Sequence, residues 1–372
     1  MNNMRKFQLL FTLLFCVTTI THATPLLAKK SGQQRTYLYN ENNQMTHSIP
    51  SSGIMTVYTY DMNGNVVSQQ GAIAVSDNQF IEDVNGDGKA DSILYYAKEG
   101  AWYVSLSTGT QFKPYSKWLA GHGIGSQQQF IADVNGDGKS DAIVHFYEAG
   151  EWYVSLSNGS SFEGYSLWKT GFGSPMYRPF IADVTGDGRA DCILFNKEKG
   201  NWSVAQSDGK SFGQQSSWLE GHGLGSHNQF VEDVNGDGKA DSIVYFGESG
   251  TWYVSLAYGT NFGAYSQWIE GHGTGSHKQL LRDVNGDKKA DSVVYFSETG
   301  TWYTSISDGA RFGNYSKWVD GHGVSSTSQL LGDVNGDGKL DSLVYFALKG
   351  SWYVSKSTGR YFEAYSKWIG LD

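Results

Sequence analysis

One acidic loop recurs six times in this chain at a constant spacing of 50 residues, and this repeat limits the possible folds more than any other feature. The first copy spans residues 83–91 and reads Asp-Val-Asn-Gly-Asp-Gly-Lys-Ala-Asp. The five later copies begin at Asp133, Asp183, Asp233, Asp283 and Asp333. A fixed period of this length indicates repeated supersecondary units rather than one conventional core.

The second repeat shows how one unit is built. A short strand at 129–132 leads into the acidic loop, and an apolar, β-branched strand at 142–146 follows it. Residues 152–157 alternate strictly between apolar and polar, which is the pattern of a half-buried strand. The hairpin signal Asn158-Gly159 then precedes a fourth strand at 162–168.

Four short antiparallel strands per unit predict an all-β fold, a β-propeller with four-stranded blades. A solenoid is the alternative, but four-stranded meanders close into rings more naturally than they stack. The six acidic repeats occupy residues 77–372. Residues 24–76 lack the loop but are strand-rich, and Gly71 and Ser76 align with the matching Gly and Ser of the next unit. We therefore predict seven blades, the first degenerate and metal-free, with six blades plus an N-terminal cap as the alternative.

Each acidic loop offers oxygen ligands at alternate positions. Calcium takes six to eight oxygens at about 2.3–2.6 Å from a flexible cage. In the first loop the side chains of Asp83, Asn85, Asp87 and Asp91 and the backbone carbonyl of Lys89 are the predicted ligands, with the lysine side chain pointing to water. The helical calcium hand is excluded, because its twelfth position needs a bidentate Glu and every copy here has an apolar residue.

The same positions predict calcium in every repeat, up to six ions. The ligands expected in the other five loops are Asp133, Asn135, Asp137, Lys139, Asp141, Asp183, Thr185, Asp187, Arg189, Asp191, Asp233, Asn235, Asp237, Lys239, Asp241, Asp283, Asn285, Asp287, Lys289, Asp291, Asp333, Asn335, Asp337, Lys339 and Asp341. Thr185 replaces the Asn ligand, and Lys288 replaces a glycine at a position that favours positive φ, so the third and fifth sites should be weakest. The ligand set implies a dissociation constant of about 10⁻⁴–10⁻³ M.

The alternative is that these loops are only Asp/Asn/Gly turns kept soluble by their charge. Six copies of five spaced oxygens favour the metal interpretation. The loops hold 18 of the 37 acidic residues, so the net charge of −9 reflects metal sites and does not indicate a basic partner. No Lys/Arg stripe stands apart from the loops, which argues against nucleic-acid binding.

Residues 1–23 have the pattern of a secretory signal peptide. Arg5 and Lys6 form a basic start, and residues 7–20 are nearly all apolar but too few for a membrane span. No second hydrophobic stretch follows, so we expect a soluble, secreted or extracytoplasmic protein without membrane insertion. Cleavage leaves Cys192 as the only cysteine, which we interpret as a small buried filler.

The loop sequence and its period resemble the FG-GAP/VCBS repeat family, the integrin-α-like calcium-binding β-propellers. The resemblance covers residues 77–372 and implies a calcium-stabilised propeller with its metal loops between the first and second strands of each blade. Members include integrin-like adhesion proteins, fungal lectins with sugar pockets between blades, and accessory modules of exported enzymes or toxins, so function stays open. Separately, residues 36–66 resemble the tyrosine–aspartate repeats of Rhs-type surface proteins.

We expect a ligand on the face opposite the acidic loops. There the connection between blades carries His122, with His222, His272 and His322 at later copies, while Phe172 breaks the series. The fourth strands contribute Trp118, Trp168, Trp218, Trp268 and Trp318. Aromatic faces stack on pyranose rings and fixed polar groups read hydroxyls, which predicts several weak sugar sites strengthened by avidity. The structural interpretation, which we rank first for these residues, is that they pack neighbouring blades.

The sequence thus predicts a secreted, calcium-binding propeller that acts as a ligand-binding module, with carbohydrate (lectin-like binding) as the first candidate ligand. An integrin-like protein–protein adhesion or scaffold module without sugar binding is the alternative, which makes the expected partner a glycan or a surface protein. We do not expect an enzyme, because most Asp residues belong to the loops and no nucleophile or zinc motif occurs. The third repeat is the least regular, which we interpret as decay or a specialised site.

Overall fold

The computed structural model describes residues 26–28, 35–39, 44–50, 54–60, 63–73, 76–347 and 349–370. These ranges contain 29 strands. They contain no helix that is long and apolar enough to cross a membrane. The chain forms two compact units, Met1–Gly71 and Ala72–Asp372, and each is considered by itself. The predicted signal peptide at 1–23 lies outside the described residues.

The N-terminal unit is one five-stranded sheet in which the strands follow chain order. Its strands are β1 (Leu26–Ala28), β2 (Arg35–Tyr39), β3 (Met45–Pro50), β4 (Ile54–Tyr60) and β5 (Val66–Ile73). The first three pairs are antiparallel. Parts of the 36–66 segment that resembles Rhs-type repeats, including residues 40–43 and 61–62, lie outside the described ranges.

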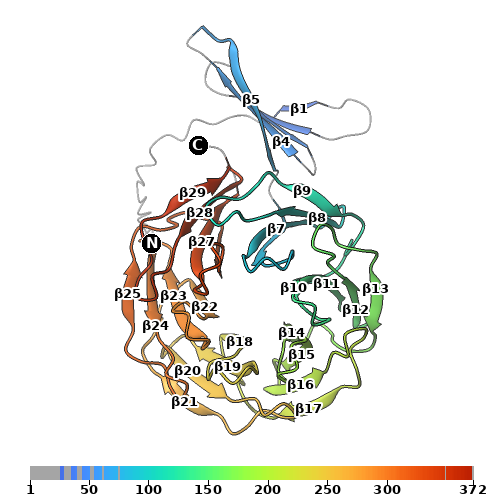
Figure 1. The fold of residues 1–372 in the computed structure, drawn as a ribbon, viewed down its shortest axis with the longest axis vertical. Helices are drawn as coiled ribbons and strands as arrows, with labels where there is room; N and C mark the ends of the chain where they lie inside the picture. The colour runs from blue at the N-terminus through green and yellow to red at the C-terminus, as the bar shows by residue number, and fades with distance from the viewer. Residues whose placement is uncertain are drawn as a thin grey trace, which may run out of the picture. The chain divides into compact units, whose positions relative to one another are not determined.

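The second unit is a propeller of six four-stranded sheets, as Figure 1 shows. Blades 1 to 3 comprise β6 (Asn78–Glu82), β7 (Asp91–Tyr96), β8 (Ala101–Ser105), β9 (Ser116–Leu119); β10 (Gln128–Ala132), β11 (Asp141–Phe146), β12 (Glu151–Ser155), β13 (Ser166–Lys169); and β14 (Tyr177–Ala182), β15 (Asp191–Asn196), β16 (Asn201–Ala205), β17 (Ser216–Leu219). Blades 4 to 6 comprise β18 (Asn228–Glu232), β19 (Asp241–Phe246), β20 (Thr251–Ser255), β21 (Ser266–Ile269); β22 (Lys278–Arg282), β23 (Asp291–Phe296), β24 (Thr301–Ser305), β25 (Ser316–Val319); and β26 (Ser328–Gly332), β27 (Asp341–Phe346), β28 (Ser351–Ser355), β29 (Ser366–Ile369).

Every blade is an antiparallel meander whose first strand lies nearest the ring axis and whose fourth lies outermost (Figure 1). The register repeats from blade to blade, and in blade 2 Phe130 lies opposite Ile143, which lies opposite Val154. The third strand has an irregularity at its Trp-Tyr pair in each blade that contains both, for example between Trp152 and Tyr153. The prediction of an all-β propeller with four-stranded blades is confirmed.

The ring closes directly between blade 6 and blade 1. The N–H of Ala90 donates to the carbonyl of Asp333 at 2.7 Å, and the hydroxyl of Ser107 donates to the carbonyl of Val334 at 2.6 Å. No place is left for a seventh blade, so the six-blade alternative holds and the preferred count of seven was wrong. The seventh blade was predicted partly from the alignment of Ser76 with the serines of later repeats. That alignment has a local cause, because Ser76 accepts a hydrogen bond from the Gln79 side chain at the start of β6.

Tryptophan fills the wedges between blades. Trp102 is fully buried and meets Phe162 of the next blade edge-on with ring centroids 6.1 Å apart, and Trp118 meets the same ring at 5.3 Å. A buried aromatic ring removes about 150–250 Å² from water, which contributes about 4–6 kcal/mol before entropy is counted. Cys192 is buried in such a cluster, as the sequence suggested.

Candidate functional site

Each acidic loop is folded by its own first aspartate. The Oδ1 atom of Asp83 accepts the N–H of Gly86 at 2.7 Å, and its Oδ2 atom accepts the N–H of Gly88 at 2.7 Å. Both glycines have positive φ, +77° and +79°, which side chains with a Cβ rarely adopt. Asn85 Oδ1 accepts the N–H of Asp87 at 2.9 Å, which completes a nested set of Asx turns.

The last aspartate of each loop is buried. The two carboxylate oxygens of Asp91 accept the N–H groups of Ser107 at 2.8 Å and Val84 at 3.3 Å. Burial raises the pKa of Asp91 to about 7. The equivalent Asp341 is also fully buried and accepts the N–H of Ser357 at 2.8 Å. A buried carboxylate that is only partly satisfied is stabilised by a cation.

The basic residue at the seventh loop position turns back onto the loop. Lys89 Nζ lies 3.3 Å from Asp87 Oδ2, and Lys139 Nζ lies 2.8 Å from Asp137 Oδ2. The expectation that this side chain points to water was therefore wrong, because the neighbouring carboxylate attracts it. Because both groups are partly exposed, each such ion pair contributes little to stability.

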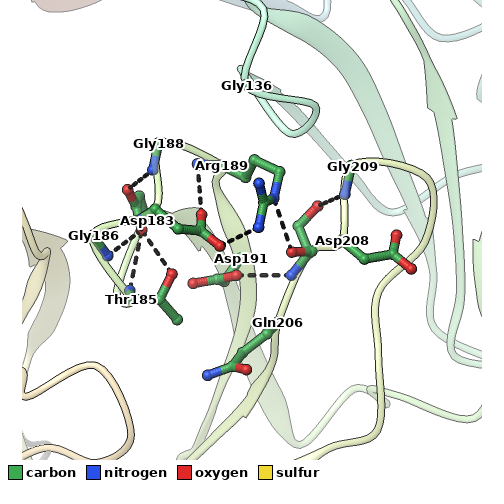
Figure 2. A network of polar contacts seen from close by, with 12 residues as sticks. Gly136, Asp183, Thr185, Gly186, Gly188, Arg189, Asp191, Gln206, Asp208 and Gly209 are labelled. Carbon is green, nitrogen blue, oxygen red and sulfur yellow. Dashed lines mark hydrogen bonds and ion pairs between the residues drawn. The ribbon is translucent and has the colours of Figure 1, made fainter.

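The two irregular loops keep the same backbone. In the third loop, shown in Figure 2, the Thr185 hydroxyl donates to Asp183 Oδ1 at 3.1 Å, while Arg189 pairs with Asp187 and donates from Nε to the Ser207 carbonyl at 3.2 Å. In the fifth loop Lys288 has φ +67°, which is the strained conformation predicted from its place in the motif.

The donor set fits a hard cation. All five predicted ligands of a loop are oxygens, which calcium and magnesium prefer and which softer metals do not. Within the described ranges, no three His, Cys, Asp or Glu side chains converge into a ready metal centre. The fit therefore depends on the chemistry of the donor set, five oxygens in each loop, one of them from the fully buried last aspartate.

The acidic loops also join the blades. The N–H of Ser140 donates to the carbonyl of Asp83 at 2.8 Å, and the same link occurs at all six blade boundaries, including the closing one. The hydroxyl of Ser157 donates to the carbonyl of Val84 at 2.5 Å, so the Asn-Gly hairpin of one blade rests on the acidic loop of the blade before it. This face of the ring is both the predicted metal face and the structural joint.

On the opposite face the predicted histidines are packing residues. His122 is fully buried, its Nε2 atom lies 3.2 Å from the Ala142 carbonyl, and its own carbonyl accepts the indole N–H of Trp102 at 3.1 Å. Burial lowers the pKa of His122 to about 4, and it lowers the pKa of the three other members of the series to about 4 as well. The other three are His222, His272 and His322.

The predicted tryptophans are also buried. The exposed fractions of Trp118, Trp168, Trp218, Trp268 and Trp318 lie between 4% and 7%. Their rings pack against a phenylalanine of the next blade instead of facing a groove. None of the nine predicted ligand-binding side chains therefore offers a ring face to the surface, which is the outcome that the packing interpretation predicted.

Tyrosines form the accessible floor of the inter-blade grooves. Between blades 3 and 4, Tyr265 is 50% exposed and stacks on His222 with centroids 4.8 Å apart. Tyr253 meets Tyr265 edge-on at 6.3 Å, and Phe246 meets Tyr253 at 5.8 Å. The hollow above them measures about 550 Å³, and Glu248 belongs to its wall.

The same groove recurs at three other boundaries. Tyr315 and Tyr365 stack on the buried histidines of the next two grooves, whose volumes are about 430 and 370 Å³. Tyr165 does the same between blades 1 and 2. The four stacking tyrosines are 47–50% exposed, and the sequence signal that could have identified them is their constant place three residues before the buried tryptophan.

Two boundaries differ. Between blades 2 and 3, Phe172 occupies the histidine position and Gln215 the tyrosine position, so no aromatic floor forms. Between blades 6 and 1, Tyr115 turns inward, where its hydroxyl lies 2.6 Å from Ser92 Oγ and accepts the indole N–H of Trp352 at 3.0 Å. At the regular boundaries the carbonyl of the buried histidine accepts the equivalent indole N–H, so the Tyr115 hydroxyl replaces that acceptor.

Comparison with known proteins agrees with this architecture. The model of the FG-GAP-like repeat matches residues 83–144, 133–194 and 183–244. A search of curated proteins gives no significant match.

Two solved structures have the same fold over most of the chain. A lectin of Agrocybe aegerita, described as recognising non-reducing terminal N-acetylglucosamine, is 23% identical with a TM-score of 0.59, covering 89% of this chain and 93% of the lectin. The Photorhabdus luminescens Tc holotoxin pore is 14% identical with a TM-score of 0.51, covering 86% of this chain and 16% of the toxin chain. At these identities the likeness concerns the fold alone. The matches to the FG-GAP-like repeat span residues 83–244, and the same four-stranded blade recurs in all six sheets of the ring.

Proposed function

We propose that this protein is an exported, calcium-binding propeller that binds carbohydrate in its inter-blade grooves. The observation that carries the proposal is the half-exposed tyrosine that stacks on a buried histidine at the same place in four grooves. The four tyrosines are Tyr165, Tyr265, Tyr315 and Tyr365. Repetition gives several similar weak sites, which a branched or repeated glycan engages together with a gain from avidity.

The grooves have the chemistry that a sugar needs. A tyrosine face accepts the C–H side of a pyranose, while Thr301 and Glu298 in the wall of the blade 4–5 groove present fixed polar groups to hydroxyls. Tyr315 is held between His272 beneath it and Tyr303 at its edge, so little side-chain freedom remains to be lost on binding. The similarity in fold to a lectin supports this class of ligand and makes N-acetylglucosamine the first sugar to test.

The grooves are not equivalent in charge. Glu248 and Glu298 belong to the walls of two of them, whereas Lys349 stands in the wall of the blade 5–6 groove. A single glycan family that differs in its substituents would therefore distribute unequally among the sites. We assign the calcium ions a structural role, because their loops lie at the blade joints on the other face of the ring.

A glycan array with residues 24–372 in millimolar calcium tests the proposal. The decisive variant is Tyr165→Ala combined with Tyr265→Ala, Tyr315→Ala and Tyr365→Ala. The matched control is Tyr258→Ala, since Tyr258 is 63% exposed but lies on the acidic-loop face in an Asn-Gly-type turn. We expect calcium-dependent binding to one related group of sugars that the control keeps and the fourfold variant loses.

An empty array from folded protein, or equal sugar binding by the fourfold variant, would overturn the carbohydrate assignment. Either result would favour the alternative hypothesis, an adhesion or scaffold module that binds a protein partner. The fourfold variant must keep the far-ultraviolet spectrum of the parent, which separates loss of binding from loss of folding. N-terminal sequencing of exported protein tests the proposed cleavage after residue 23.

A further inference from the structure

The mouth of the ring on the groove face carries unbalanced positive charge. Each innermost strand places one residue at this level, and the set consists of two cations and four neutral residues. The six are Asn78, Gln128, Arg178, Asn228, Lys278 and Ser328. Nearer the acidic loops the cation on the inner strands is paired with carboxylates, because Arg282 of blade 5 lies 3.0 Å from Glu82 of blade 1 and 2.7 Å from Glu232 of blade 4.

Side-chain hydrogen bonds link neighbouring blades around this mouth. Asn78 donates to Gln129 of the next blade, and Asn228 donates to Gln279 in the same way. Blade 3 interrupts the series, because Pro179 stands where five other blades have this glutamine. Proline has no side-chain acceptor, so Gln128 of blade 2 has no equivalent partner across the boundary.

A pocket of about 710 Å³ lies at this interruption. Its polar lining includes Gln128, Tyr147, Tyr177, Arg178, Lys197 and His227, and no Asp or Glu lines it. The absence of acidic residues from the lining is notable in a chain whose net charge is −9. The pocket shares Gly223, Gly225 and His227 with the groove between blades 3 and 4, so the two hollows adjoin.

The cations at the mouth have no carboxylate partner among the residues that the structure describes. Arg178 Nη1 donates to Asn228 Oδ1 at 3.1 Å and to Gln229 Oε1 at 3.2 Å, and its guanidinium lies over the Phe180 ring at 5.4 Å. These contacts fix the guanidinium without neutralising it. Burial lowers the pKa of Lys278 and the charge of Arg178 lowers it further, which shows that the two cations share one environment.

We propose that this axial pocket binds an oxyanion, a carboxylate or sulfate group, with Arg178 as its main contact. A guanidinium has several N–H donors in a rigid fork that matches two oxygens of such a group. The amide of Gln128 and the tyrosine hydroxyls of the lining supply further neutral hydrogen bonds. The site is separate in chemistry from the tyrosine floors of the grooves and does not depend on sugar binding there.

Calorimetric titration of the folded, calcium-loaded protein with sodium sulfate, glucuronate and neutral glucose tests the site. The decisive variant is Arg178→Gln, and its matched control is Arg360→Gln, which removes the same charge from an exposed turn on the other face. A second variant, Pro179→Gln, restores the residue found in the other blades and gives Gln128 a partner. We expect both pocket variants to weaken sulfate and glucuronate binding at least tenfold, and the control to match the parent.

Equal affinity for sulfate in parent and Arg178→Gln protein, or no binding of either anion to the parent, would overturn the site. Similar affinities for sulfate and glucuronate would mean that the pocket binds any free oxyanion, and tighter glucuronate binding would mean that it binds a sugar acid; both support the proposal. The variant Tyr315→Ala, in a groove that shares no residue with the pocket, should keep full anion binding. Failure of groove binding and failure of this site are thereby distinguished.

Discussion

The two faces of the ring differ in how strictly the repeat is kept. On the acidic-loop face all six copies have the same turns and the same blade-to-blade backbone link. On the groove face four boundaries are alike and two are not. A loop that must both fold itself and join two blades tolerates little change, whereas a groove can change without opening the ring. Variation between repeats therefore collects on the face where we propose that ligands bind.

The largest expected effect comes from removing calcium from the acidic-loop face. For the proposed sites, with a dissociation constant of about 10⁻⁴–10⁻³ M, we expect 10 mM free calcium to stabilise each loop by about 1.4–2.7 kcal/mol, or roughly 8–16 kcal/mol for six loops. We expect chelator to lower the melting temperature by about 10 °C or more in differential scanning calorimetry. An identical melting curve in chelator and in calcium would show that the loops act without metal.

Acid should act on the groove face through its buried histidines. The folded pKa of His272 is lowered to about 4 from the ordinary 6.5, so its neutral form is favoured by folding and stability is lost as the pH falls from about 6.5 towards 4. The variant His272→Phe copies the arrangement at Phe172 and removes this pH-dependent loss of stability. We expect the parent to lose roughly 3 kcal/mol more than the variant on going from pH 7.5 to pH 4.

Denaturant unfolding in saturating calcium at several pH values measures this difference. Comparing the two proteins at each pH cancels the loss of calcium that acid also causes. Parallel pH profiles would mean that His272 does not remain neutral in the folded ring.

The closing boundary should be the one that depends on a tyrosine hydroxyl. In Tyr115→Phe the buried indole N–H of Trp352 loses its acceptor, which costs about 1–3 kcal/mol. The matched change Tyr315→Phe, at a regular groove, should leave the free energy of unfolding unchanged within about 0.5 kcal/mol. Urea denaturation of both variants checks the pair, and equal losses would show that ring closure needs no special contact.

The smallest effect should come from relieving backbone strain on either face. Lys288 on the acidic face and Ser325 on the groove face are the two residues other than glycine with positive φ, +67° and +64°, in the part of the chain that the structure describes. Lys288→Gly and Ser325→Gly should each raise the free energy of unfolding by about 1 kcal/mol. Calcium affinity should rise only for Lys288→Gly, which titration calorimetry can detect. A loss of stability in both variants would show that the positive φ of Lys288 and Ser325 does not strain the backbone.

The sequence predicted the blade well because its signals are local. The alternation in residues 152–157, the hairpin at Asn158-Gly159 and the acidic loop each depend on contacts within one unit. The blade number was predicted wrongly because closure depends on a contact between the two ends of the ring. Ser76 matches the serines of later repeats because its hydroxyl accepts a hydrogen bond from Gln79 at the start of β6. This local role gives no information on the number of blades.

The site was predicted less well, for a related reason. Alternation in the third strand places Trp152 and Tyr153 on opposite faces, but it does not reveal which neighbour covers each face. The next blade covers the tryptophan, and the tyrosine faces the groove. Tyr165 was predicted to lie in a fourth strand at 162–168, but that strand spans Ser166–Lys169, so Tyr165 and its equivalents lie in a non-strand segment where alternation gives no direction.

No blade of this ring borrows a strand from the other end of the chain. Each is one uninterrupted stretch, and the link from Ala90 to Asp333 that joins the last blade to the first is the same link that joins every other pair. For the closed ring, the point at which the polypeptide begins is therefore arbitrary. Rejoining the ends of the ring and opening any one of the glycine-rich connections should yield circular permutants with the same fold.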